Sequence, residues 1–86
     1  MSTRSVELSD VAKQQFARIQ EPFHASILKK LKLLQEHGLE LNNIKALAGN
    51  LAGYYRLRVG RYRVIFMVSE DIFFVTSITL RRDAYE

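Results

Sequence analysis

Apolar residues at helical spacing mark the first part of the chain. Four of them follow one another three or four positions apart: Leu8, Ala12, Phe16 and Ile19. This spacing predicts a helix over residues 10–20, because such positions lie on one side of a helix. Ser9 and Asp10 are placed to cap its first turn with side-chain oxygens.

A second apolar stripe predicts a second helix shortly afterwards. Its members are Phe23, Ile27, Leu31 and Leu34. Pro22 suits the first turn of this helix, and Gly38 is placed to cap its end. Because the connection between the two helices is short, we expect them to form an antiparallel hairpin.

Alternation of apolar and polar residues predicts four strands. They cover Arg4–Leu8, Gly53–Val59, Arg61–Val68 and Ile72–Leu80. Residues 39–51 have no clean period and are interpreted as loop. The order β-α-α-β-β-β predicts an α+β fold in which an N-terminal strand and a helical hairpin precede a three-stranded antiparallel meander, with the helices packed on one sheet face. At 86 residues, the chain is expected to form a single domain over residues 1–86.

The central hairpin has a predicted register. A two-residue Gly60-Arg61 turn pairs Val59 with Tyr62 and, further along, Arg58 with Arg63. The apolar side chains then share the face toward the helices, and these are Tyr55, Leu57, Val59, Tyr62, Val64 and Phe66. The opposite face receives the arginines, which are Arg56, Arg58 and Arg63. Like charges directly across a strand pair repel, so this arrangement is not one that stability alone favours.

The last strand admits two registers. If residues 69–71 all belong to the turn, the inward side chains are Ile72, Phe74, Ile78 and Leu80, and Arg81 joins the arginine face. A two-residue turn instead brings Phe73 and Val75 inward. We favour the first register because it buries more large apolar side chains.

Charge and composition narrow the classes of function. The chain has 13 Lys and Arg against 9 Asp and Glu, and residues 41–69 contain Lys45 and four arginines with no acid. Such a cluster predicts an anionic partner. The absence of cysteine excludes disulfides, thiolate zinc sites and a cysteine nucleophile. No apolar run approaches the roughly 20 residues of a membrane span, and the first eight residues do not resemble a signal peptide. We therefore expect a cytoplasmic protein without a membrane partner.

Arginine is suited to phosphate because its planar fork donates two parallel hydrogen bonds. Tyr54 and Tyr85 add aromatic surfaces on which bases can stack. The two histidines, His24 and His37, lie thirteen residues apart on the second predicted helix, and we expect no metal site from them.

Residues 47–66 resemble a known signature. They read Leu-Ala-Gly-Asn-Leu-Ala-Gly-Tyr-Tyr-Arg-Leu-Arg-Val-Gly-Arg-Tyr-Arg-Val-Ile-Phe, similar to the central strands of the RelE/ParE toxin superfamily. The ending from Arg81 to Tyr85 is similar to the arginine-x-x-x-tyrosine close of that family. The resemblance covers essentially the whole chain. It implies the toxin of a toxin–antitoxin pair, bound by a cognate antitoxin protein.

The RelE branch of this superfamily cleaves messenger RNA on the ribosome, using the 2′-hydroxyl to attack the adjacent phosphate, without a metal or other cofactor. Carried over by position, the resemblance implies a catalytic set of Arg56, Arg58, Arg63, Arg81 and Tyr85. Further RNA contacts are expected from Tyr54, Arg61, Arg82 and Lys45. Arginine holds its proton in proteins, so the arginines are expected to clamp phosphate, and the identity of the general base stays open.

The sequence leaves two other hypotheses about the function open. The ParE branch poisons DNA gyrase by binding it, although that branch generally lacks the basic set and the terminal tyrosine seen here. Alternatively, the arginine face serves a catalytically inactive binding module with an acidic partner.

Overall fold

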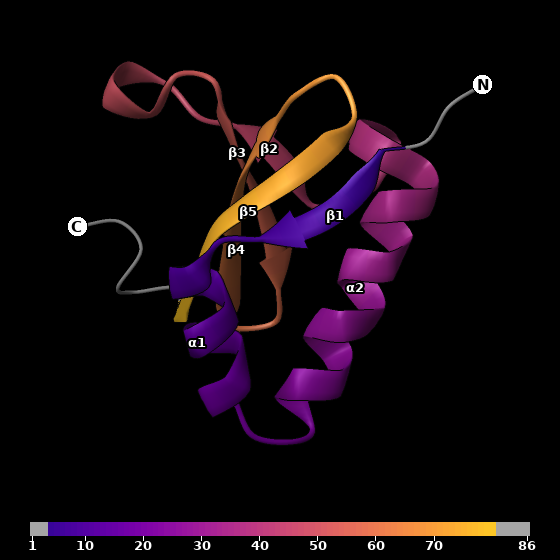
Figure 1. Cartoon of the computed structure of the whole chain (residues 1–86), viewed down its shortest axis with the longest axis vertical. Coiled ribbons are helices and arrows are strands. Elements are labelled where there is room, and N and C mark those ends of the chain that lie inside the picture. The colour runs from indigo at the N-terminus through magenta and orange to yellow at the C-terminus, as the bar shows by residue number, and fades with distance from the viewer. Residues whose placement is uncertain (1–3, 81–86) are drawn as a thin grey trace.

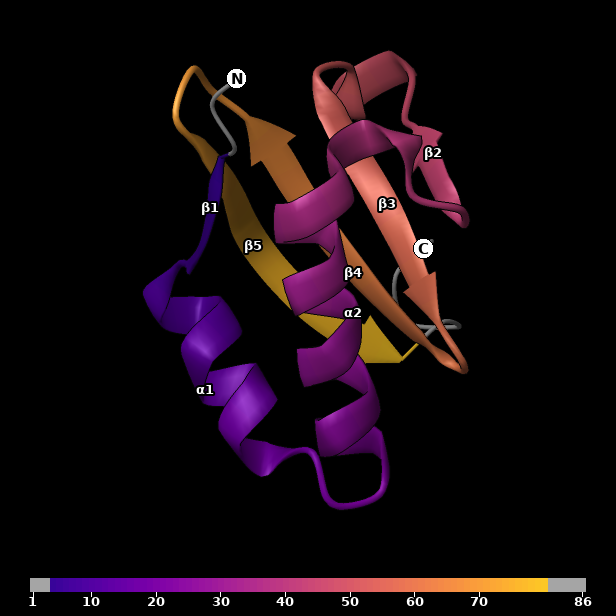
Figure 2. The ribbon, with the colours of Figure 1, turned by 90° about the vertical axis from the view of Figure 1, so that its right-hand side faces the viewer.

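The computed structural model describes residues 4–80 and shows one sheet with two helices on one of its faces (Figures 1 and 2). The strands are β1 (Ser5–Leu8), β2 (Ile44–Ala46), β3 (Tyr54–Val59), β4 (Tyr62–Val68) and β5 (Ile72–Leu80). The helices are α1 (Asp10–Arg18) and α2 (Phe23–His37), and short 3-10 turns follow at Gly38–Glu40 and Gly49–Leu51. The strand order is β1-β5-β4-β3-β2, with β1 parallel to β5 and the other pairs antiparallel. The predicted α+β fold is confirmed.

The interpretation of residues 39–51 as loop is wrong in one part. Ile44–Ala46 form β2, an edge strand that pairs with β3. Alternation becomes recognisable over about four to eight residues, so a three-residue strand leaves no readable pattern in the sequence. The sheet is therefore one strand wider than predicted.

Helix α1 begins as the sequence predicts. The Ser9 hydroxyl accepts a hydrogen bond from the Ala12 backbone N–H at 3.1 Å, which satisfies one of the free amides of the first turn. The same hydroxyl donates to the Thr76 carbonyl of β5 at 3.2 Å. The helix ends at Arg18, two residues earlier than predicted, because Ile19 adopts extended backbone angles.

Helix α2 runs from Phe23 to His37, and Gly38 caps its end as predicted. Pro22 is the N-cap residue, so it precedes the first turn in which the sequence placed it. Gly38 has φ 66°, a conformation that glycine adopts without steric cost, and its N–H bonds the Leu34 carbonyl. The stripe residues Ile27, Leu31 and Leu34 are buried against the sheet. Neither this helix nor any other among residues 4–80 is long and apolar enough to cross a membrane.

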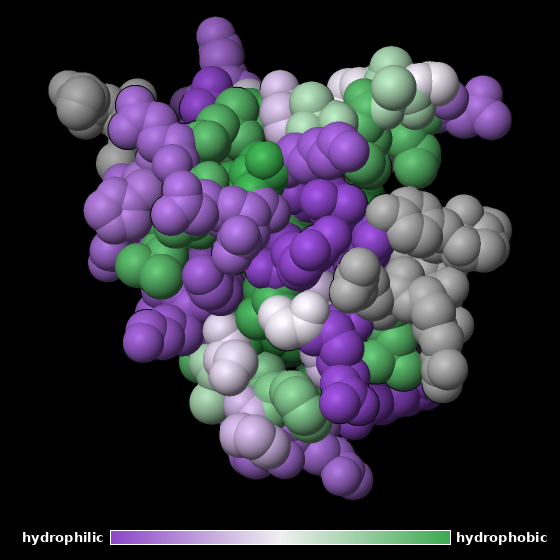
Figure 3. Space-filling model, turned by 180° about the vertical axis from the view of Figure 1, so that it is seen from behind, coloured by the Kyte–Doolittle hydropathy of each residue, from purple (hydrophilic) through white to green (hydrophobic). Residues whose placement is uncertain are grey.

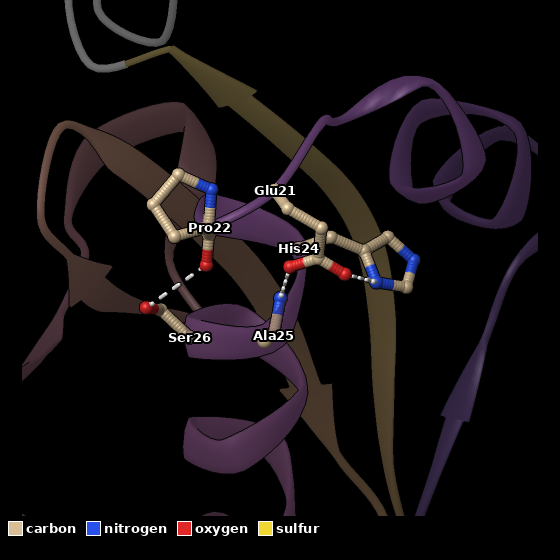
Figure 4. A network of polar contacts seen from close by, with 5 residues as sticks. All are labelled: Glu21, Pro22, His24, Ala25 and Ser26. Atoms are coloured by element: carbon tan, nitrogen blue, oxygen red, sulfur yellow. Dashed lines mark hydrogen bonds and ion pairs between the residues drawn. The ribbon is translucent and has the colours of Figure 1, made fainter.

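A small polar network shapes the connection between the helices (Figure 4). The Glu21 carboxylate accepts a hydrogen bond from the Ala25 backbone N–H at 3.0 Å, and its other oxygen lies 3.9 Å from His24 Nδ1. The Ser26 hydroxyl donates to the Pro22 carbonyl at 3.3 Å. These contacts fix the first turn of α2, and the two helices run antiparallel on the same side of the sheet (Figure 2).

The core lies between the helices and the central strands. The predicted pairing of Val59 with Tyr62, and of Leu57 with Val64, is confirmed. Leu57, Val59, Val64 and Phe66 are buried, and the rings of Tyr55 and Tyr62 pack against them. The predicted apolar face of the β3–β4 hairpin is therefore the face that the helices cover.

Strand β5 combines the two registers that the sequence left open. Phe66 pairs with Val75 and Ile65 pairs with Ser77, so Thr76 is an extra residue that forms a β-bulge. Phe73 and Val75 are buried before the bulge, and Ile78 is buried after it. The favoured register is wrong for Ile72 and Phe74 and right for Ile78, because the bulge shifts the alternation by one residue. Arg81 lies outside the described residues.

Each helix also supplies a side-chain acceptor to a strand. The Gln15 amide oxygen accepts a hydrogen bond from the Ile78 N–H at 2.7 Å. The Gln35 amide oxygen accepts one from the Val6 N–H at 2.9 Å. These amides satisfy N–H groups that no strand in the described part of the chain pairs at these points.

Candidate nucleic-acid interface

The sheet face turned away from the helices carries the cationic side chains. Along β3 the buried residues are Leu57 and Val59, so the alternating residues Arg56 and Arg58 lie on the other face. The register pairs Arg58 with Arg63, as predicted. Three arginines thus lie on two adjacent strands, two of them directly opposite each other.

Strand β2 adds a fourth cation to this group. Lys45 pairs with Arg56, and directly opposed residues of an antiparallel pair share a face, with Cβ atoms about 4.5–5.5 Å apart. We call the set Lys45, Arg56, Arg58 and Arg63 the basic face. The sequence proposed Lys45 for its charge, but only β2 places this residue beside the arginines. In the view from behind, hydrophilic side chains gather near the centre of the surface (Figure 3).

The basic face is less open than the sequence suggests. Arg63 is 2% exposed and is the one buried charged side chain among residues 4–80, while Arg56 and Arg58 are half-buried. Each of these three arginines has an interaction partner within the protein. A guanidinium held in a partly desolvated setting interacts more strongly with a bound anion than one in bulk water, because the surrounding dielectric constant is lower.

A pocket of about 410 Å³ adjoins Arg63. It lies over the sheet face between β3, β4 and β5, under the segment that follows β2. Its lining consists of Leu47, Leu51, Tyr54, Arg63, Ile65, Thr76 and Ser77. Tyr54 and Arg63, both proposed from the sequence, therefore meet at one site.

At the other end of the same sheet face the surface is apolar. A shallow hollow of about 340 Å³ is lined by Met67, Val68, Ser69, Ile72 and Phe74. Met67 pairs with Phe74, which places both side chains on the face away from the helices. The face thus divides into a basic part and an apolar part.

The remaining candidates lie elsewhere. The Arg61 guanidinium lies 5.6 Å from the centre of the Phe23 ring, at the start of α2, so the structure does not bring Arg61 to the basic face. The proposed residues Arg81, Arg82 and Tyr85 lie outside the described residues.

The histidines do not take part in this site. The His24 ring stacks on Phe16 with the ring centres 4.0 Å apart, and His37 lies beside Glu36 at the end of α2. Within residues 4–80, His, Asp and Glu form no group of three that would suit a metal ion.

Thr76 and Ser77 are the polar lining residues that the sequence did not predict. No sequence signal marks these two residues, because four apolar residues precede them and their side of the sheet is set by the β-bulge. The bulge turns both side chains to the pocket side.

Several solved structures have the same fold, and one of them is a toxin–antitoxin complex. The RelBE2 toxin–antitoxin complex of Mycobacterium tuberculosis contains a chain with a TM-score of 0.81 at 18% identity, covering 92% of this chain and 99% of that one. YafQ of Escherichia coli has a TM-score of 0.80 at 15% identity, covering 96% of this chain and 99% of that one. The archaeal RelE–RelB complex of Pyrococcus horikoshii contains a chain with a TM-score of 0.79 at 20% identity, covering 95% of this chain and 99% of that one. These likenesses establish the fold.

The family follows from the sequence itself. Residues 6–85 match the family model described as the ParE toxin of the type II toxin–antitoxin system parDE. The chain therefore belongs to this toxin family, and the resemblance to the RelE/ParE superfamily is confirmed. The sequence has no significant match among curated proteins.

Proposed function

We propose that this toxin is a ribosome-dependent messenger RNA endonuclease that inhibits translation. The observation that carries the proposal is the basic face, where Arg58 lies opposite a buried Arg63 and Lys45 lies opposite Arg56. Four cations on adjacent strands suit a phosphate group, because guanidinium groups bind phosphate with two parallel hydrogen bonds.

The chemistry requires three events at the scissile phosphate. The 2′-hydroxyl loses its proton, its oxygen attacks the adjacent phosphorus, and the departing 5′-oxygen takes up a proton. In this proposal Arg56, Arg58 and Arg63, together with Arg81, bind the phosphate and stabilise the additional negative charge of the pentacoordinate state. Tyr85 orients or activates the 2′-hydroxyl. The guanidiniums keep their protons, so they act as clamps in this scheme and not as acid or base.

A cognate antitoxin belongs to the same proposal. Similar structures include the RelB–RelE complex of Methanococcus jannaschii and the RelBE2 complex, in which the toxin is bound to its antitoxin. The divided sheet face, basic at one end and apolar at the other, suits a segment that carries both acidic and apolar side chains. Binding of the protein encoded by the neighbouring gene tests this expectation.

The cleavage proposal is tested by translation in vitro followed by primer extension on the message. We expect Arg63→Gln to slow cleavage about a hundredfold or more, because it removes one preorganised charged donor. Arg61→Gln is the matched control on the same hairpin, and it should cleave near the wild-type rate because Arg61 lies over Phe23. An intact message with the wild type, or equal rates for the two variants, contradicts the proposal.

The family model favours a second candidate, a toxin that inhibits DNA gyrase, because the model is described as ParE. Expression of the protein distinguishes the two candidates. DNA breaks and an SOS response with intact messages would support gyrase inhibition. Cleaved messages without DNA damage would support the endonuclease, and unimpaired growth would favour an inactive binding module.

A further inference from the structure

The β-bulge in β5 places two neighbouring hydroxyl groups on one side of the sheet. In regular alternation Thr76 and Ser77 would point to opposite faces, with one of them toward the core. Here both line the pocket beside Arg63. Bulges often re-aim a side chain next to a functional site.

The shape of the bulge is held from both sides. The Thr76 hydroxyl donates to the Ile65 carbonyl of β4 at 3.3 Å. The Thr76 carbonyl in turn accepts a hydrogen bond from the Ser9 hydroxyl at the start of α1 at 3.2 Å. Two independent contacts therefore fix this backbone, so the pocket wall is preorganised before any ligand binds.

The pocket has the lining that a flat, partly polar ring requires. Leu47, Leu51 and Ile65 supply apolar walls, and Tyr54 supplies an aromatic side chain. Its volume of about 410 Å³ lies within the range of roughly 300–1,000 Å³ typical of small-molecule sites. Thr76 and Ser77 add two hydroxyl groups to this lining.

We infer that this pocket binds one unpaired nucleobase of RNA, next to a phosphate held by Arg63. The inference rests on the proposed function, because it assigns a second subsite to the same RNA substrate. Single-stranded RNA is commonly recognised by unstacked bases that insert between apolar or aromatic side chains and bond through their edges. The Ser77 hydroxyl can donate a hydrogen bond to the base or accept one from it. The Thr76 hydroxyl already donates to the Ile65 carbonyl, so its oxygen can only accept a hydrogen bond from the base.

The subsite is tested with two small probes that differ only in the base: adenosine 5′-monophosphate and ribose 5-phosphate. Titration of the full ¹⁵N-labelled chain, followed by NMR, gives both dissociation constants. We expect the nucleotide to bind about tenfold more tightly, as base stacking contributes about 1–3 kcal/mol per base. Shifts of the Tyr54, Thr76 and Ser77 amides should accompany binding of the nucleotide and not of the sugar phosphate.

Two variants change the pocket and one is a matched control. Ser77→Leu fills the pocket and should reduce the affinity for the nucleotide to that for the sugar phosphate. Leu51→Ser removes a wall at a residue that is 44% exposed, so folding should tolerate it, and it should also reduce the preference. Ser26→Leu, on the exposed side of α2, should leave both constants unchanged. Arg63→Gln should weaken the binding of both probes by the same factor.

Equal affinity of the wild type for both probes would overturn the inference. An unchanged ratio in both pocket variants would overturn it as well. Neither measurement requires cleavage, so the subsite and the endonuclease proposal fail separately. A nucleotide preference without message cleavage would support the subsite and contradict the endonuclease, and cleavage without the preference would do the reverse.

Discussion

Ser9 joins two parts of the molecule through one hydroxyl group. Its oxygen accepts from the Ala12 N–H of α1, and its hydrogen goes to the Thr76 carbonyl at the bulge of β5. Helix capping and the geometry of the pocket wall therefore depend on the same side chain. A residue chosen for capping alone could equally be Asp, which accepts the first bond but cannot donate the second.

Ser9→Ala should lower the free energy of unfolding by about 1–2 kcal/mol, because the cap and the bond to the bulge are both lost. Urea denaturation measures this. Ser9→Asp should recover part of the loss, since it restores the cap alone. Ser26→Ala is the control, because this exposed hydroxyl bonds only the Pro22 carbonyl, and its effect should stay within about 0.5 kcal/mol. Equal effects of the two alanine variants would contradict the assignment.

At the scale of elements, β5 is longer than the strand beside it. β1 covers β5 only from Ile72 to Val75, so no strand within residues 4–80 pairs with the outer edge of β5 beyond the bulge. Gln15 of α1 fills part of this gap by accepting the Ile78 N–H at 2.7 Å. A helix side chain thus continues the hydrogen bonding of the sheet where the short edge strand ends.

Gln15→Leu should destabilise the fold by about 1–3 kcal/mol, since it leaves a part-buried N–H without an acceptor. Gln15→Glu keeps the acceptor and should cost much less. Hydrogen exchange at the Ile78 amide gives a local measure, and it should accelerate in the leucine variant more than global unfolding alone requires. If exchange is the same in both variants, Gln15 does not protect this amide.

The sequence predicts best the elements that are long and regular. Both helices and the β3–β4 register follow from periodicity and from one glycine turn, so the pairing of Arg58 with Arg63 was predictable. The β-bulge was not, because each half of β5 fits a different register and the sequence alone gives no reason to combine them. β2 was too short to be detected from the sequence. The position of Lys45 beside Arg56 could therefore not be predicted either.

The burial of Arg63 at the candidate site could not be predicted from the sequence either. Alternation assigns a face to Arg63 but not the packing around it, and burial of a guanidinium to 2% exposure depends on the whole tertiary structure. Thr76 and Ser77 were missed for a related reason. Their side of the sheet is set by the bulge and not by their own spacing.

At the scale of the whole molecule, the two faces of the sheet have separate roles. The helices cover one face and form the core with it (Figure 2). On the uncovered side of the sheet, the basic face lies toward β2 and β3. An apolar hollow, lined by Met67, Ile72 and Phe74, lies toward the β4–β5 turn on the same side. An antitoxin segment that covers this face would block the proposed RNA site directly, without changing the fold of the toxin.

Lys45→Glu should therefore weaken antitoxin binding about tenfold, mainly at low salt, because it reverses a charge on the face that the proposed acidic segment would cover. Lys32→Glu is the matched control, since Lys32 is exposed on α2 and lies on the covered side of the sheet. Calorimetric titration with the neighbouring-gene protein at two salt concentrations gives the comparison. Equal losses in both variants would show that net charge matters and that the sheet face does not.

The position of β5 between β1 and β4 also sets an order of events during synthesis. Ser5 pairs with Ile72, so the first strand made has no partner until nearly the whole described chain has been translated. At about 5–20 residues per second, the interval between making β1 and completing β5 is roughly 4–14 seconds. Through that time the nascent chain lacks the strand that carries Thr76 and Ser77. A toxin built this way cannot assemble its proposed active surface until β5 has been translated.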